Sequence, residues 1–97
     1  MKVLGLDVIK DATDRHPNAA SVFHRWCLEA ESAAWATPQD IKNRYASVSF
    51  LDNNRVVFNI GGNRYRLVVM VKYAHGAMVV IMAGSHAEYD AWNRSRK

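Results

Sequence analysis

The fold is decided by residues 55–85, which read RVVFNIGGNRYRLVVMVKYAHGAMVVIMAGS. This stretch contains three runs rich in the β-branched and aromatic residues that favour strands. The runs are residues 55–60, 64–73 and 77–83. The segments between them, GGN at 61–63 and HG at 75–76, are typical of tight turns. Short turns between strands predict an antiparallel meander.

The sequence before the meander is mainly helical. A short strand is expected at residues 2–6, followed by a helical turn capped by Asp7 and broken at Pro17. From Pro17 to Ala33 apolar residues recur every three or four positions, which predicts the longest amphipathic helix. We expect this helix to cover one face of the sheet.

Two further helices are marked by their caps. Thr37, followed by a proline, opens a short helix that runs to about Arg44, and a strand at 47–51 then leads into the meander. Ser85 and Glu88 have the spacing of a capping box, which starts a final helix. The element order predicts an α+β domain in which helices pack on an antiparallel sheet.

Length and composition predict one globular domain that spans residues 1–97. Hydrophobic residues make up 49% of the chain and charged residues 23%, which is enough for a packed core. The chain has one cysteine, Cys27, so a reducing, cytoplasmic location is expected. Early charges at Asp7 and Lys10 interrupt any signal peptide, and no apolar run is long enough to cross a membrane.

Charge is distributed unevenly along the chain. Residues 1–40 contain four Lys/Arg and six Asp/Glu, whereas residues 41–97 contain nine and three, so the second part carries 9 − 3 = +6. Such an asymmetry indicates a surface that faces a polyanion, such as nucleic acid. A small domain can also carry a basic face that is simply solvated.

The strand at 64–73 places Arg64, Arg66 and Lys72 on one face, opposite the apolar face with Tyr65, Leu67, Val69, Val71 and Tyr73. Residues two positions apart on a strand are separated by roughly 7 Å, and guanidinium groups suit bidentate contact with phosphate. This pattern predicts a track for a nucleic-acid backbone. Because Val68 and Met70 share that face, a solvent-facing strand with ordinary charges remains an alternative.

The final helix gathers His86, Tyr89 and Asp90 on one face, at positions i, i+3 and i+4. RNA cleavage without a metal needs a base for the 2′-hydroxyl, an acid for the leaving oxygen and a cation for the phosphorane. Histidine commonly transfers protons near neutral pH, so His86 is the first candidate. Alternatively, His86 only follows the helix cap and Tyr89 only packs on the sheet.

Other kinds of chemistry lack a motif here. No HExxH pattern, cysteine pair or acidic cluster indicates a metal site, and no serine-hydrolase motif is present. We therefore expect no metal and no cofactor. The remaining histidines, His16, His24 and His75, receive no role.

Three stretches together resemble a known family: residues 56–69 with GNRYRL, residues 84–90 with HAEYD, and Trp35-Ala36-Thr37-Pro38. They are similar to HigB-type toxins of bacterial toxin–antitoxin modules, within the RelE/ParE superfamily. The resemblance covers nearly the whole chain in the same order of elements. It implies a RelE-like fold for this chain.

The resemblance also implies an activity and partners. The expected activity is that of an endoribonuclease, an mRNA interferase that acts on message, often bound to the ribosome. The expected protein partner is a helix-turn-helix antitoxin of the HigA kind. By motif, the catalytic group comprises Arg66, His86, Tyr89 and Asp90, of which Asp90 either orients His86 or only caps a local contact. RNA contacts are expected at Lys42, Arg55, Asn63, Arg64 and Lys72.

Two departures from the family pattern keep other functions open. Ile81 lies where relatives commonly have arginine, and Met70 replaces a frequent lysine. One alternative is a toxin of the ParE kind that poisons DNA gyrase without hydrolysis, although the His86/Tyr89 pair argues against it. Another is a catalytically weakened relative that binds the antitoxin.

Overall fold

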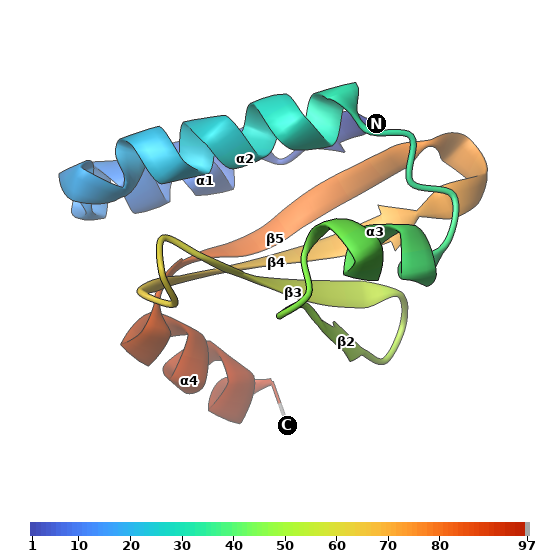
Figure 1. The fold of residues 1–97 in the computed structure, drawn as a ribbon. Helices are drawn as coiled ribbons and strands as arrows, with labels where there is room; N and C mark the ends of the chain where they lie inside the picture. The colour runs from blue at the N-terminus through green and yellow to red at the C-terminus, as the bar shows by residue number, and fades with distance from the viewer. Residues whose placement is uncertain (97) are drawn as a thin grey trace.

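The computed structural model describes residues 1–96 (Figure 1). Its strands are β1 (Lys2–Leu4), β2 (Ser49–Leu51), β3 (Arg55–Ile60), β4 (Tyr65–Lys72) and β5 (Ala77–Ser85). Its α-helices are α1 (Leu6–Arg15), α2 (Ala20–Ser32), α3 (Pro38–Arg44) and α4 (His86–Ser95). Short 3₁₀ turns occupy Pro17–Ala19 and Tyr73–His75. The predicted α+β class is confirmed.

The strands form one sheet in the order β1-β5-β4-β3-β2. Strands β2 to β5 are the predicted antiparallel meander. The prediction of a wholly antiparallel sheet is wrong at one edge, because β1 pairs in parallel with β5, with Val3 opposite Met78. The chain between these two strands contains α1, α2, α3 and strands β2 to β4, which is more than long enough for the crossover that a parallel pair needs, and the sheet is therefore mixed.

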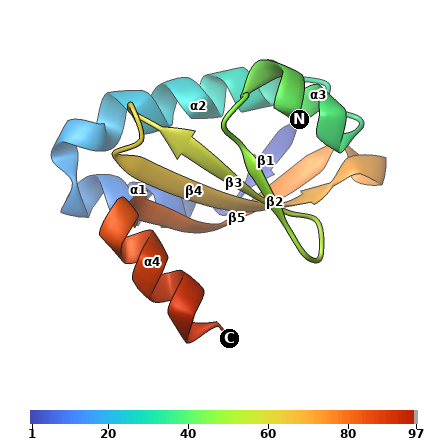
Figure 2. The ribbon, with the colours of Figure 1, turned by 60° about the horizontal axis from the view of Figure 1, so that its bottom comes forward.

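The helices lie on both sides of the sheet but cover it unequally. Figures 1 and 2 show α1 and α2 lying across one face, with α3 on the same side near β3. Helix α4 leaves the end of β5 toward the opposite side. No helix in the described residues is long and apolar enough to cross a bilayer.

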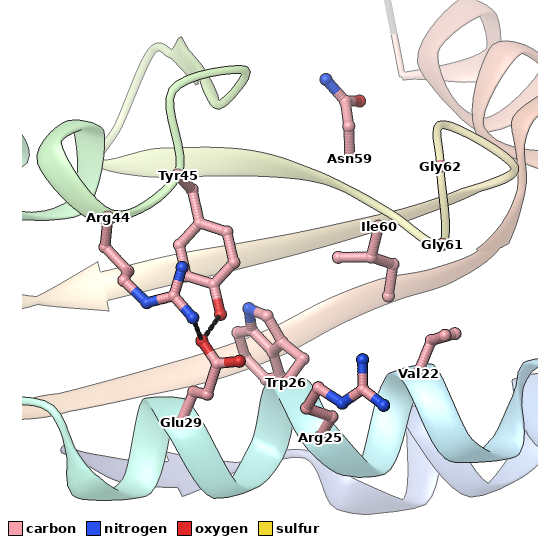
Figure 3. A pocket seen from close by; sticks show the side chains of 10 residues that line it. All are labelled: Val22, Arg25, Trp26, Glu29, Arg44, Tyr45, Asn59, Ile60, Gly61 and Gly62. Carbon is pink, nitrogen blue, oxygen red and sulfur yellow. Dashed lines mark hydrogen bonds and ion pairs between the residues drawn. The ribbon is translucent and has the colours of Figure 1, made fainter.

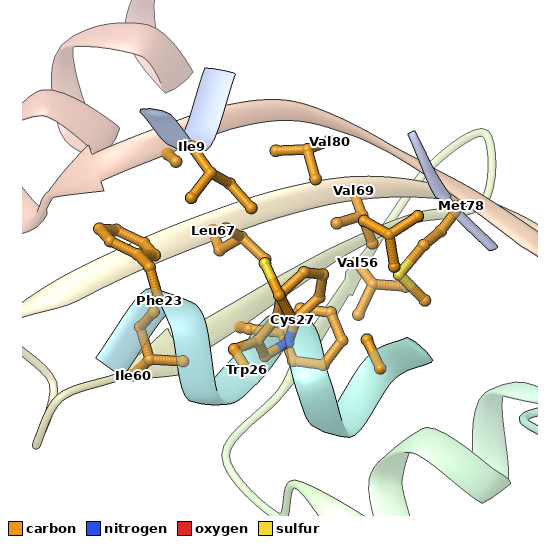
Figure 4. Packing of buried hydrophobic residues seen from close by; sticks show 14 of the residues in the cluster. Ile9, Phe23, Trp26, Cys27, Val56, Ile60, Leu67, Val69, Met78 and Val80 are labelled. Carbon is orange, nitrogen blue, oxygen red and sulfur yellow. The ribbon is translucent and has the colours of Figure 1, made fainter. Parts of the chain in front are cut away.

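The main core fills the space between α1, α2 and the sheet (Figure 4). Phe23, Trp26 and Phe58 are among its largest fully buried side chains, and Trp26 meets Phe58 edge to face at 5.3 Å. The expected apolar face of β4 belongs to this core: Leu67, Val69 and Val71 are buried in it, with Tyr65 and Tyr73 packed at its margin. The predicted alternation along β4 is confirmed.

The opposite face of the sheet carries a second, smaller apolar cluster. Val57, Val68 and Met82 are buried there. Tyr89 and Trp92 of α4 pack against them. These contacts hold α4 on the face of the sheet that α1 and α2 leave open.

Helix starts were predicted with mixed success. Thr37 and Ser85 form complete capping boxes with Asp40 and Glu88, as the sequence indicated. Asp7 is not a cap, since α1 begins one residue earlier and follows Gly5, whose φ is +80°. A Cβ at Gly5 would lie 2.6 Å from the carbonyl oxygen of Val80, so the turn from β1 into α1 requires glycine.

Candidate active site

The site is built where β5 passes into α4. The Ser85 hydroxyl accepts from the Glu88 N–H at 3.1 Å, and the Glu88 carboxylate accepts from the Ser85 N–H at 2.8 Å. The His86 N–H donates to the carbonyl of Arg64 at 3.2 Å. The first turn of α4 is therefore fixed beside the β3–β4 hairpin, residues 61–64.

The predicted His86, Tyr89 and Asp90 share one end of α4. His86 Nδ1 lies 3.4 Å from Asp90 Oδ2, and about half of each side chain is exposed (54% and 50%). Tyr89 is half-buried beside Trp92, with ring centroids 5.9 Å apart. An accessible imidazole next to a carboxylate has the geometry for exchanging a proton with a ligand, because the carboxylate can orient the ring.

Arg66 reaches the same end of the sheet from β4. It pairs with Asn59 of β3 and with Gly84 of β5, two residues before His86. Its Nη1 donates to the carbonyls of Asn63 at 3.1 Å and Tyr65 at 3.4 Å. Within residues 1–96 no carboxylate forms an ion pair with this guanidinium, which leaves its charge available to an anion.

A cluster that the sequence reasoning missed anchors α4 to α1. It comprises Arg15, His16, Ser85 and Glu88, and we call it the Glu88 cluster. The Glu88 carboxylate accepts from Arg15 Nε at 2.9 Å and lies 2.8 Å from His16 Nε2. Arg15 Nη2 also donates to the Ala83 carbonyl at 3.1 Å.

The electrostatics of this cluster favour an ionised Glu88. Partial burial by itself raises the pKa of the carboxyl group. The hydrogen bonds from Arg15, the Ser85 N–H and His16 outweigh it and lower that pKa from 4.5 to about 2. A Cβ at Gly84 would overlap Glu88 Oε1, so the carboxylate occupies the space that glycine leaves open.

Nothing local in the sequence signals the role of Arg15 and His16. His16 was given no role, yet it meets a residue 72 positions away, and Arg15 meets one 73 positions away. The capping box revealed only the contact of Glu88 with its own helix. The charged residue at the end of α1 gave no indication of its partner.

The expected RNA-binding residues do not form one group. Asn63 and Arg64 lie in the hairpin beside Arg66, and Arg64 precedes β4 instead of sharing its face. Lys72 stands six positions from Arg66 along β4, about 20 Å on an extended strand. Arg55 lies at that distant end, opposite Met70.

Lys42 lies in a third place. It is on α3, where its Nζ donates to the carbonyl of Ala46 at 2.6 Å and approaches that of Val48 at 3.4 Å. The predicted RNA-binding residues therefore divide into three separate locations: the hairpin, the far end of β4 and α3.

Ile81 occupies a bulge. The β4–β5 register shifts between Val68 and Val69, which pair with Met82 and Val80 and leave Ile81 without a partner. Its side chain is half-buried against the cluster of Val57, Val68 and Met82. This position faces the same side of the sheet as α4, and isoleucine adds apolar contact there where an arginine would add charge.

The titratable groups present can supply acid–base and electrostatic chemistry. The group near the hairpin contains an imidazole, a phenol, a carboxylate and a guanidinium. Among residues 1–96 no three His, Cys, Asp or Glu residues are grouped so that they could hold a metal ion.

Comparison with known proteins adds two findings. Residues 19–92 match the family described as HigB toxin, a RelE-like toxic component of a toxin–antitoxin system. An mRNA interferase HigB of Escherichia coli O6:H1 is 22% identical over 96 residues, which cover 97% of this chain and 93% of that protein. Arg15 and His16 lie before the matched segment, and the whole of the hairpin and the first turns of α4 lie inside it.

Proposed function

Since the chain belongs to the HigB family of RelE-like toxic components of toxin–antitoxin systems, we propose that it is an endoribonuclease that cleaves messenger RNA. The relative named an mRNA interferase supports the same reaction class. The expected substrate is message on the ribosome. The toxic effect would then be the loss of translation.

In this proposal four residues act on one phosphodiester. His86 and Tyr89 transfer protons between the 2′-hydroxyl, which attacks the phosphorus, and the 5′-oxygen, which leaves. Arg66 stabilises the charge on the phosphorane, and Asp90 orients His86 through the 3.4 Å contact. The products are a 2′,3′-cyclic phosphate and a free 5′-hydroxyl.

One observation carries the proposal. The guanidinium of Arg66, which lacks a carboxylate partner in the described chain, lies at the same end of the sheet as an accessible imidazole. The hydrogen bond from the His86 N–H to the Arg64 carbonyl fixes the first turn of α4 next to the start of β4. A cation and a proton carrier held at one place are what the reaction requires.

The test is cleavage of a defined message by His86→Ala and Arg66→Ala, with ribosomes and, separately, on free RNA with a chelator. Loss of one acid or base typically costs about 10²–10⁴-fold in rate, and loss of one charge-stabilising donor about 10²–10³-fold. Both variants should therefore be nearly inactive and non-toxic.

The matched controls are His24→Ala and Lys10→Ala, which remove an exposed histidine and an exposed cation from α2 and α1. They should cleave at the rate of the unmodified chain, and thermal melts should show that all four variants are folded. If folded His86→Ala cuts normally, His86 is only a neighbour of the cap and proton transfer belongs to Tyr89 or to another group.

The family membership implies an antitoxin, and we infer that it is a helix-turn-helix protein of the HigA kind. Co-expression of the neighbouring gene product should rescue growth, and the two proteins should co-purify. A neighbour that neither binds the chain nor relieves toxicity would contradict this assignment.

A further inference from the structure

A cavity of about 350 Å³ lies between α2, the end of α3 and the β3–β4 hairpin (Figure 3). We call it the α2–α3 cavity. Val22, Ile60 and the ring of Trp26 form apolar parts of its wall, and Arg25 and Arg44 bring cations to it. Its size falls within the range of sites for small ligands.

One donor in the wall has no acceptor in the protein. Trp26 is only 2% exposed, and its Nε1 is buried without a hydrogen-bond partner. Buried N–H groups are almost always paired, and the exceptions reflect strain, a bound water or a ligand, so this N–H is a candidate donor to a molecule bound at the cavity. In Figure 3 this nitrogen is on the side of the indole ring that faces Tyr45 and Arg44.

The charges of the wall are not balanced. Glu29 accepts from Arg44 and, at 2.6 Å, from the hydroxyl of Tyr45, so Arg44 is already paired. Burial and the bond to Glu29 raise the pKa of Tyr45, which keeps its hydroxyl a donor. Arg25 forms no ion pair with any carboxylate in the part of the chain that the structure describes.

The β3–β4 hairpin connects the cavity to the candidate active site. Gly61 and Gly62 of the hairpin line the cavity. The next two residues, Asn63 and Arg64, accept hydrogen bonds through their carbonyls from Arg66 and from the His86 N–H. The hairpin, residues 61–64, therefore lies between the cavity on the α2 side and Arg66, which shares the Val68 face of β4 that α4 covers.

We propose that the α2–α3 cavity binds a nucleotide of the RNA that flanks the scissile one, with a phosphate at Arg25 and the base on the apolar wall beside Trp26. This proposal rests on the proposed function. The chemistry fits, because the unpaired guanidinium of Arg25 suits a phosphate and the apolar wall suits a base. The aromatic and aliphatic wall accepts any base, so the subsite contributes affinity more than sequence choice.

The experiment uses the complete protein and a short 2′-O-methyl oligoribonucleotide, which cannot be cleaved because its attacking hydroxyl is blocked. The indole N–H resonances are followed by NMR and assigned with Trp35→Phe and Trp92→Phe. The Trp26 resonance should shift and its hydrogen exchange should slow on binding. Inorganic phosphate alone should leave this resonance largely unchanged, because it supplies no base.

Arg25→Ala should weaken binding of the same oligonucleotide about tenfold, which is the usual effect of losing one charged hydrogen bond. It should also lower the slope of log affinity against log salt by about 0.7. Lys10→Ala, which removes an equal charge from α1, should do neither. Truncating the oligonucleotide one nucleotide at a time should abolish the effect of Arg25→Ala at a defined length.

The outcomes separate this inference from the proposed function. If the oligonucleotide binds and message is cleaved while the Trp26 resonance stays fixed and Arg25→Ala binds normally, the cavity is not an RNA subsite and the enzyme assignment stands. If the antitoxin shifts the Trp26 resonance and RNA does not, the cavity is a protein interface. If the oligonucleotide shifts Trp26 while no message is cut, the subsite stands and the nuclease proposal fails.

Discussion

Glu88→Gln should destabilise the domain in a way that depends on pH. The pKa of Glu88 is lowered from 4.5 to about 2, which corresponds to about 3 kcal/mol if the whole shift is counted. Because 35% of the side chain is exposed, solvent screening reduces the expected contribution to about 1–2 kcal/mol. Glutamine keeps the size of the side chain and its ability to cap, but removes the charge that Arg15 contacts.

The sign follows from the direction of the shift. A carboxyl group whose folded pKa is lowered stabilises the folded state above its ordinary pKa, and this contribution is lost as the pH falls from about 4.5 to about 2. At pH 7 the melting temperature of Glu88→Gln should lie about 5–15 °C below that of the unmodified chain. By pH 3 more than half of the difference in unfolding free energy should be gone.

The assay is urea denaturation of both proteins at pH 7, 4 and 3, with Glu31→Gln as the control. Glu31 is an exposed carboxylate on α2, and its substitution should change stability little at any pH. A loss of stability in Glu88→Gln that is equal at pH 7 and pH 3 would mean that the shape of the side chain matters and its charge does not. No loss at all would refute the role of the Glu88 cluster.

Other substitutions test the site itself. Arg15→Ala should lower kcat for cleavage with little change in KM, since α4 loses its anchor to α1, and Arg15→Lys should restore part of kcat. Tyr89→Phe keeps the packing against Trp92 and should leave the melting temperature unchanged, while cleavage should fall about 10²–10⁴-fold because the hydroxyl that transfers a proton is gone. Arg64→Ala and Lys72→Ala should each flatten the salt dependence of RNA binding by about 0.7, and an unchanged slope in both would place the RNA surface elsewhere.

The parts of the fold that depend on neighbouring residues could be predicted from the sequence. Turns at 61–63 and 75–76, the alternation along β4 and the caps at Thr37 and Ser85 all rest on interactions within a few positions. The parallel pairing of β1 with β5 could not be predicted, because it joins Lys2 to Ala77, 75 positions apart in the sequence. The cap at Asp7 was wrong for the same reason, since the close approach of Gly5 to Val80 sets where α1 begins.

In the candidate site, too, only the features that depend on neighbouring residues could be predicted from the sequence. Its motifs placed His86, Tyr89 and Asp90 on one helix, and their grouping follows from helical spacing alone. Their position next to Arg66 depends on strand register, which the hairpin fixes. The distance from Arg66 to Lys72 follows from six positions on the predicted strand, whereas the place of Arg55 opposite Met70 depends on the register of β3 with β4.

Helix α4 contacts the rest of the domain through few groups, and this has a consequence for the site. Its apolar contacts are Tyr89 and Trp92 on the small cluster of Val57, Val68 and Met82. Its polar contacts to α1 pass through the single carboxylate of Glu88. A helix that packs on one side only can tilt when one contact is lost, and any tilt moves His86 relative to Arg66. The precision of the site therefore depends on Arg15 and His16, which lie more than 65 positions before α4 and outside the segment that matches the family.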